Sequence, residues 1–256
     1  MSMIHHAQAS RAAPSEEHHY ALGIGFGAYS IPDYPGAEHI NQVVSPIPFF
    51  QYEGPRLNIA NGRLSSFLFN SERLVIDISA DGTPPVKSTN NRARDGMPDL
   101  DPVVEFGPAL EYQLWAFKES LVRLDIPLRY GISTDLRRAN GIGWISNPRV
   151  KYHFQYNHWR FRAGMGPIFA SKAHNNYYYG VENTLSNPLR DAFNGHSGYS
   201  GFLYSLGLQK KQGRFKYDAY FRLIDLQESK RQKSPLVDQK RSFLAGAAIT
   251  WVILDK

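Results

Sequence analysis

Long segments in which apolar and polar or small residues strictly alternate limit most strongly what this chain can form. Leu22, Ile24 and Phe26 alternate with small residues, and the same period of two returns repeatedly along the chain. It spans residues 74–79, 104–114, 122–130, 159–169, 215–223 and 243–253. Successive side chains of a strand point to opposite faces, so this period predicts β-strands. No segment shows a clear period of 3.6, and we therefore expect an all-β fold.

The length of these strands separates two kinds of all-β protein. Many of the alternating segments extend to about 10–13 residues, whereas strands of soluble proteins usually contain about 5–6 and membrane-crossing strands about 9–11. The longest nearly uncharged apolar run, residues 243–254, is too short for a membrane helix, which needs about 20 residues. Length therefore favours a transmembrane barrel, in which one face of each strand meets lipid and the other lines the lumen.

The connections between the strands are of two kinds. Tight turns are expected at 54–55, 70–72, 116–119, 157–158 and 211–213, and long polar loops at 30–41, 81–100, 132–142, 171–197 and 227–240. Short periplasmic turns and long extracellular loops are typical of outer-membrane barrels. The two kinds alternate only if residues 56–69 form two short strands split at Asn61-Gly62, a strong hairpin signal. We therefore predict an antiparallel up-and-down barrel of about 12 strands.

The amino-terminal residues indicate the cellular compartment in which the protein folds. Ala7-Gln8-Ala9 fits the small-x-small pattern that precedes signal-peptidase cleavage, without the charged and apolar regions of a complete signal peptide. We expect the chain to be exported, with a signal peptide that is missing or truncated here. Residues 1–19 are then a signal-peptide remnant and a disordered periplasmic tail, and residues 20–256 are a single barrel domain.

The polar face of the predicted strands carries charges of both signs. The residues expected to line the lumen are Asp77, Glu105, Glu111, Arg123, Asp125, Arg129, Arg149, Lys151, Arg160, Arg162, Lys216, Asp218 and Arg222. Acids paired with bases on neighbouring strands would brace the wall, whereas unpaired bases around water would select anions. Because a barrel of about 12 strands has a narrow lumen, we favour a largely filled one.

The four tryptophans lie near the ends of predicted strands. Trp115, Trp159 and Trp251 fall at the short-turn end, and Trp144 falls near the long-loop end. Outer-membrane barrels carry aromatic girdles at both membrane interfaces, which predicts that these residues form such girdles. The alternative is that tryptophan is simply a good strand former.

The net charge of +6 favours negatively charged binding partners. The long loops carry the bases Lys87, Arg92, Arg94, Arg137, Arg138, Lys172, Arg190, Lys230, Arg231 and Lys233. Facing outward, they would pair with phosphates of outer-membrane lipid and lipopolysaccharide; ordinary solvated charge is the alternative. The bases are dispersed and no groove-reading element is present, so nucleic acid is not an expected partner.

Sequence signals for catalysis are weak. The chain has no Cys, which excludes thiol catalysis and Cys-ligated zinc. Neither a G-x-S-x-G nucleophile motif nor a metal-binding loop occurs. We expect no enzymatic activity and no cofactor, although a hydrolase site around His174 and His196 in the loop of residues 171–197 stays open as a third option.

Three short motifs stand out along the chain. The first follows the first strand and is joined to a proline-rich second strand, the second is a tyrosine-rich segment, and the third lies near the last hairpin. Their residues are Asp33, Tyr34, Pro35, Gly36, Tyr52, Tyr178, Tyr179, Gly180, Val181 and Pro235. Together the three motifs resemble the MipA/OmpV family of MltA-interacting proteins.

The resemblance implies an outer-membrane protein of Gram-negative bacteria. The named member of the family is implicated as a scaffold that joins a lytic transglycosylase to a murein synthase, so the resemblance implies these periplasmic murein enzymes as partners and a non-enzymatic role at the cell envelope. Other members are described as porin-like, and the alternative function is therefore a small anion-tolerant diffusion channel.

Overall fold

The computed structural model describes residues 18–54, 57–60 and 63–256, and nearly all of these belong to strands or to the loops that join them. The strands are β1 (His19–Pro32), β2 (Ile40–Glu53), β3 (Leu57–Ala60), β4 (Arg63–Asn70), β5 (Leu74–Thr83), β6 (Val103–Phe117), β7 (Ser120–Thr134), β8 (Ala139–Ser146), β9 (Arg149–Tyr156), β10 (Trp159–Ala170), β11 (Gly198–Gln212), β12 (Phe215–Asp225) and β13 (Arg241–Asp255). The expected signal-peptide remnant at residues 1–9 lies outside the described residues.

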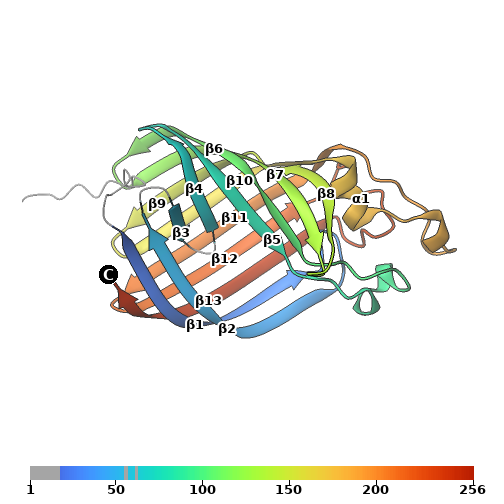
Figure 1. Ribbon diagram of the computed structural model, residues 1–256, viewed down its shortest axis with the longest axis horizontal. Coiled ribbons are helices and arrows are strands. Elements are labelled where there is room, and N and C mark those ends of the chain that lie inside the picture. The colour runs from blue at the N-terminus through green and yellow to red at the C-terminus, as the bar shows by residue number, and fades with distance from the viewer. Residues whose placement is uncertain (1–17, 55–56, 61–62) are drawn as a thin grey trace, which may run out of the picture.

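The strand pairings run around the molecule and return to their start. β1 pairs along its length with β2 and, on its other side, with β13, so the first and last strands close the wall. The pairings among the described strands are antiparallel, and they link sequence neighbours around the ring except at β8 and β9, each of which pairs with β7 and β10. The strands are tilted against the long axis of the molecule (Figure 1). The fold is therefore the predicted all-β, antiparallel, up-and-down transmembrane barrel.

The 13 strand segments occupy twelve positions in the wall. β8 and β9 are two parts of one crossing, because both pair with β7 on one side and with β10 on the other. Asn147 and Pro148 separate them, and a proline has no N–H to give to the ladder. The Asn147 side-chain amide instead donates to the carbonyl oxygens of Gly166 and Pro167, at 3.3 and 2.7 Å. The predicted count of about 12 is confirmed.

The division of residues 56–69 into two strands is also confirmed. β3 and β4 pair antiparallel from Leu57↔Ser66 to Ala60↔Arg63, and β4 then pairs with β5. The Asn61-Gly62 turn expected between them lies outside the described residues. β3 is short, and between the described residues its ladder with β2 consists of Tyr52↔Ile59 and Glu53↔Asn58.

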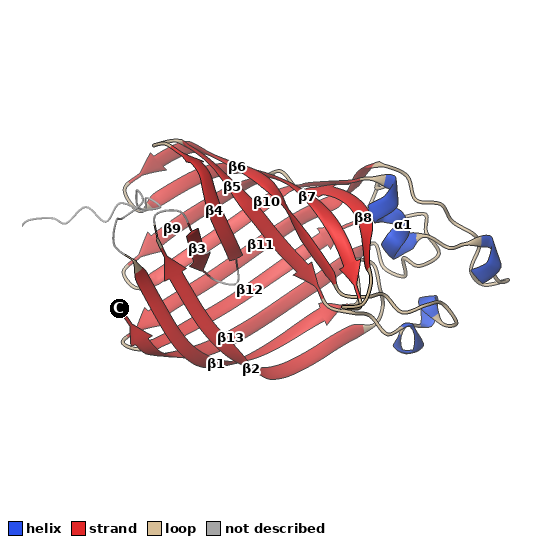
Figure 2. Ribbon diagram, in the orientation of Figure 1, coloured by secondary structure: helices blue, strands red, loops and turns tan. Residues whose placement is uncertain are grey.

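Turns and loops segregate to opposite ends of the barrel, as Figure 2 shows. The tight turns after β4, β6, β9 and β11 lie where expected. The expected long loop at 132–142 is wrong, because β7 continues to Thr134 and β8 begins at Ala139. The Asp135 carboxylate accepts hydrogen bonds from the backbone N–H groups of Arg137 and Arg138, at 2.8 and 2.7 Å, and this local turn closes the hairpin early.

The helical segments all lie in the long loops. They are α1 (Lys172–Tyr179) and the 3-10 turns Ser88–Asn90, Arg92–Arg94 and Asn183–Leu185. The sequence did not predict α1, whose amino terminus is capped by the Ser171 hydroxyl, which accepts from the His174 N–H. Among the described residues, no helix is long and apolar enough to cross a bilayer.

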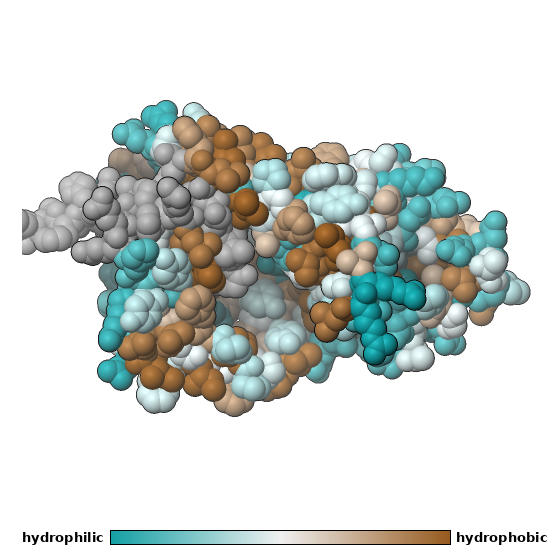
Figure 3. All heavy atoms as spheres, in the orientation of Figure 1, coloured by the Kyte–Doolittle hydropathy of each residue, from teal (hydrophilic) through white to brown (hydrophobic). Residues whose placement is uncertain are grey.

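The outward face of the barrel is apolar. Large side chains such as Phe26, Met165, Leu206 and Ile249 are more than half exposed, and apolar residues spread over the strands in Figure 3 while polar ones dominate the loop end. Such a surface suits hydrocarbon rather than water.

The tryptophans lie toward the ends of the barrel wall. Trp115, Trp159 and Trp251 stand at the short-turn ends of β6, β10 and β13, and Trp144 stands in β8 opposite Tyr130. Trp115, Trp144 and Trp251 are about half exposed, at 49%, 47% and 46%. Girdle roles for these residues stay a prediction.

Candidate functional site

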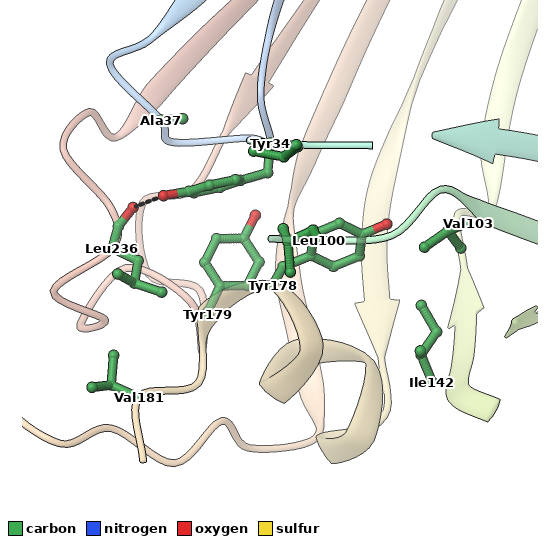
Figure 4. Packing of buried hydrophobic residues seen from close by; sticks show 10 residues of the cluster. Tyr34, Ala37, Leu100, Val103, Ile142, Tyr178, Tyr179, Val181 and Leu236 are labelled. Atoms are coloured by element: carbon green, nitrogen blue, oxygen red, sulfur yellow. Dashed lines mark hydrogen bonds between the residues drawn. The ribbon is translucent and has the colours of Figure 1, made fainter. Parts of the chain in front are cut away.

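The long loops fold together into a packed cap over one end of the barrel. The cap is built around the buried residues Tyr34, Ala37, Val86, Leu100, Val103, Ile142, Tyr178, Tyr179, Val181 and Leu236. Figure 4 shows the rings of Tyr34 and Tyr179 beside each other, with Leu236 at the Tyr34 hydroxyl. Because the members come from loops far apart in sequence, closing the barrel is what brings them into one apolar cluster.

Residues of the three family motifs meet in this cap. The Tyr34 hydroxyl donates to the Leu236 carbonyl oxygen at 3.0 Å, beside Pro235. The Tyr179 hydroxyl donates to the Pro35 carbonyl oxygen at 2.8 Å. The Ser234 hydroxyl donates to the carbonyl oxygen of Tyr179 at 2.7 Å. Every motif is therefore bonded directly to at least one other.

The loop that carries Gly36 needs a glycine. Gly36 has a φ of +99°, and a Cβ there would lie 2.9 Å from the Leu226 side chain and 3.1 Å from that of Val237. Its carbonyl oxygen accepts from the N–H groups of Asp238 and Gln239, at 2.9 and 3.0 Å. The same close approach therefore ties the β1–β2 loop to the β12–β13 loop.

The remaining motif residues also serve the loops, with one exception. The buried Asp33 carboxylate accepts from the side-chain amides of Asn41 and Asn91, both at 2.8 Å. Gly180 ends α1, and Val181 pairs with Phe193 across an isolated bridge. Tyr52 is the exception, since it lies at the far end of the barrel with its hydroxyl 2.6 Å from Nδ1 of His18.

A buried polar network joins the cap to the barrel wall. His174 Nε2 lies 3.0 Å from Glu105 Oε1, and Arg129 Nε donates to the other Glu105 oxygen at 3.3 Å. Arg231 Nη2 lies 3.4 Å from His174 Nδ1. Because arginine can only donate, Nδ1 accepts and the neutral ring carries its proton on Nε2. Burial lowers the pKa of His174 and Arg231 lowers it further, although Glu105 opposes them.

Of the two histidines named for a possible hydrolase site, His174 is engaged in this local structure, while His196 is exposed. The Ser171 hydroxyl accepts from the N–H groups of Trp144 and His174, at 3.0 and 3.3 Å. The carbonyl oxygen of His196 accepts from the Asn175 side chain at 2.6 Å. His174 therefore bonds a carboxylate and a guanidinium, which is a structural arrangement rather than a base aimed at a nucleophile.

One side of the lumen is lined by ion pairs. Asp125 lies 2.9 Å from Arg149 and 2.5 Å from Lys151. Glu111 lies 3.7 Å from Arg123 and 3.9 Å from Lys151. Together with Arg129–Glu105 and the buried Asp77, these residues come from β5, β6, β7 and β9. Acids and bases on neighbouring strands are thus paired and brace this wall. This is the first of the two arrangements that the sequence left open, the other being unpaired bases around water.

The opposite side of the lumen is different. Arg160, Arg162, Lys216 and Arg222 face inward from β10 and β12 together with Asp218, which accepts from the Gln209 amide at 2.6 Å. Among the described residues, no carboxylate lies within 4.0 Å of Arg160, Arg162 or Arg222. Bases therefore outnumber acids among these residues of the wall.

Two cavities inside the barrel are lined by residues that the structure describes. The upper cavity, about 220 Å³, lies under the cap between Tyr178 and Arg222. The lower cavity, about 420 Å³, reaches the short-turn end, where the exposed turn residues Asn157 and His158 line it.

Some loop bases expected to face outward are buried instead. Arg94, Arg190 and Arg231 are only 3%, 7% and 3% exposed. Arg190 donates to the carbonyl oxygens of Ala93 and Asp95, at 3.0 and 2.8 Å. Guanidinium groups satisfy several carbonyl oxygens at once, which is how irregular loops can be buried. The sequence offers no local pattern that separates these bases from exposed ones such as Arg137 and Arg138.

The sequence profile of the family described as "MltA-interacting protein MipA" matches residues 24–253. No curated protein sequence matches the chain. Among solved structures, a bacterial polysaccharide outer membrane secretin is 8% identical with a TM-score of 0.45, over 91% of this chain and 98% of that one. Outer membrane phospholipase A from Escherichia coli is 11% identical with a TM-score of 0.34, over 93% of each chain.

Identities this low transfer no activity. The family match stands on the sequence itself and spans nearly the whole barrel, from within β1 to within β13. The chain therefore belongs to the MipA family of MltA-interacting proteins, and it is an outer-membrane barrel protein.

Proposed function

We propose that the protein is a non-enzymatic scaffold of the outer membrane that holds periplasmic murein enzymes, a lytic transglycosylase and a murein synthase, at the cell envelope. The observation that carries the proposal is the cap. Its buried cluster and its hydrogen bonds between distant loops cover the extracellular mouth, and the ion pairs of β5–β9 brace the wall below. A barrel closed in this way is suited to presenting a surface rather than to passing solutes.

The surface available to a periplasmic partner is the rim of short turns. It includes the exposed charged residues Glu72, Arg73, Lys118, Glu119, His158 and Arg214. A soluble periplasmic enzyme can reach this rim, while the membrane separates it from the capped end. Mixed charges on such a rim favour an electrostatically guided contact.

Affinity capture tests the scaffold. The full chain in detergent is expected to retain a purified lytic transglycosylase, and Arg73→Glu with Arg214→Glu should weaken retention at least fivefold. Arg137→Glu with Arg138→Glu is the matched control at the capped end and should leave retention unchanged. Absence of retention by the parent, or equal loss in both double variants, would contradict a scaffold that acts through its rim.

The second candidate, an anion-tolerant channel, is favoured by the basic wall of β10 and β12. Planar-bilayer recording separates the two functions. The scaffold predicts no steady single-channel current from the parent barrel. A steady current that prefers anions, and that loses this preference on Arg160→Glu with Arg162→Glu, would establish the channel instead.

A further inference from the structure

The lower cavity combines features that a sealed structural barrel does not need. Its volume of about 420 Å³ lies within the usual range of ligand pockets, about 300–1,000 Å³. Its wall is formed by inward-facing residues near the short-turn end, among them Gln155, Arg160, Gln209, Lys211 and Lys216. Most of these side chains carry positive charge or an amide N–H.

The acids near this cavity are already engaged. Among the described lining residues, Asp255 is the one carboxylate, and it lies at the rim, 3.2 Å from Lys211 and 3.1 Å from His19. Asp218, one step deeper, accepts from the Gln209 amide at 2.6 Å. Arg160 has no carboxylate within 4.0 Å among the described residues. The cavity therefore holds an excess of positive charge.

The strand geometry concentrates that charge. Arg160 and Arg162 are two residues apart on β10, so both side chains point to the same face, about 6–7 Å apart along the strand. Arg160 lies opposite Gln155 on β9 and opposite Gln209 on β11. Lys216, only 8% exposed, holds its ammonium group 4.6 Å from the centre of the Phe49 ring. Arg160 and Lys216 line the cavity, and Arg162 lies one step deeper along β10.

We propose that the lower cavity is a binding site for a small soluble oxyanion, bearing phosphate or carboxylate groups, that enters from the periplasm. A guanidinium presents its N–H donors as a planar fork that matches two oxygens of such a group. A narrow cleft in which one sign of charge predominates also raises the local concentration of counter-ions. The buried cluster of the cap lies at the other end of the barrel, which favours holding the anion over conducting it.

Calorimetric titration with inorganic phosphate tests the site. The full chain, folded in a zwitterionic detergent with no phosphate-bearing lipid present, should bind phosphate in a saturable manner. Arg160→Gln with Arg162→Gln should raise the Kd at least tenfold, while the exposed pair Arg137→Gln with Arg138→Gln should leave it unchanged. Citrate in place of phosphate distinguishes the two anion chemistries, since a carboxylate site binds citrate more tightly.

A single substitution that keeps both arginines controls for a folding defect in the double variant. Gln155→Glu places a carboxylate directly across the strand pair from Arg160, so it should compete with the anion and also raise the Kd while both arginines remain. Folding of each variant is checked by its gel mobility without boiling. Saturable binding that survives in both variants, or no binding of either anion by the parent, would overturn the proposal. Neither result bears on capture of a murein enzyme at the rim.

Discussion

At the scale of single residues, the lumen shows how a buried charge can be tolerated. Asp125 is completely buried, and two cations from β9, Arg149 and Lys151, approach it. Asp218 occupies a comparable inward position on β12 and accepts from the neutral amide of Gln209. A carboxylate taken out of water is stable only when it is paired or hydrogen-bonded. Because the two aspartates have different partners, we expect their replacement by a neutral residue to change the free energy of unfolding by different amounts.

We expect Asp125→Asn to lower the free energy of unfolding by about 3 kcal/mol, because it leaves two partly buried cations without their anion. Asp218→Asn is the matched control and should cost less than about 1 kcal/mol, because asparagine keeps an oxygen that can accept from Gln209. Urea unfolding from detergent or bilayers, followed by tryptophan fluorescence, measures both values. Equal costs would show that the ion pairs of β9 do not stabilise the wall.

At the scale of elements, α1 is an eight-residue helix that depends on what surrounds it. Isolated helices of this length are not stable in water. The Ser171 cap, the Arg231–Asn175 hydrogen bond of 2.7 Å and the His174–Glu105 contact hold it against the loops and the wall. The groups that face His174 are Glu105 from β6, Arg129 from β7 and Arg231 from the β12–β13 loop.

These contacts predict a pH dependence of the cap. Burial lowers the pKa of His174 below its ordinary value of 6.5, so the folded cap binds this proton less readily than the open one. The neutral His174 therefore contributes its full stabilisation of the folded cap above about pH 6.5. This contribution is lost as the pH falls from 6.5 toward the lowered pKa of His174. Amide hydrogen exchange of α1, corrected for intrinsic rates, should therefore accelerate between pH 7.5 and 5.5. His174→Gln should remove this trend, and an unchanged trend would exclude His174 as its source.

At the scale of the whole molecule, closure distinguishes this fold from an open sheet. β13 pairs with β1 through ten residue pairs, from Ala21↔Asp255 to Ser30↔Ala245, and this pairing removes the sheet edges that β1 and β13 would otherwise expose. Backbone groups within lipid must all be satisfied internally, so opening the seam is costly, and we expect the barrel to unfold as a unit.

The closed barrel predicts anomalous gel mobility. Unboiled samples should migrate differently from boiled ones, and far-ultraviolet circular dichroism in detergent should be dominated by β-structure. Deleting residues 241–256 removes the strand that closes the seam and should abolish the mobility difference, whereas deleting residues 2–9 should preserve it. A shift retained without β13 would mean that the seam does not hold the barrel together.

The fold could be predicted from the sequence because each strand is specified by the pattern of its own residues. Alternation such as Leu22, Ile24 and Phe26 reflects a strand with lipid on one side, and the pattern returns in six further segments of the sequence. Strand length and the placement of turns then decided the membrane setting and the number of strands. The exceptions are equally local: the Asp135 turn shortened one expected loop, and Pro148 divided one crossing into β8 and β9.

The cap and the charge pattern of the lumen were decided only by the tertiary structure. Tyr34, Tyr179 and Leu236 are far apart in sequence, and no period relates loops whose contacts depend on ring closure. The sequence by itself predicted which residues face inward, but not that Asp125 would have two cations while Arg160 would have no carboxylate beside it in the part of the chain that the structure describes. Pairing depends on register and on which strands become neighbours. The side of the wall to which a side chain points depends only on the alternation of the backbone, which is set within each strand.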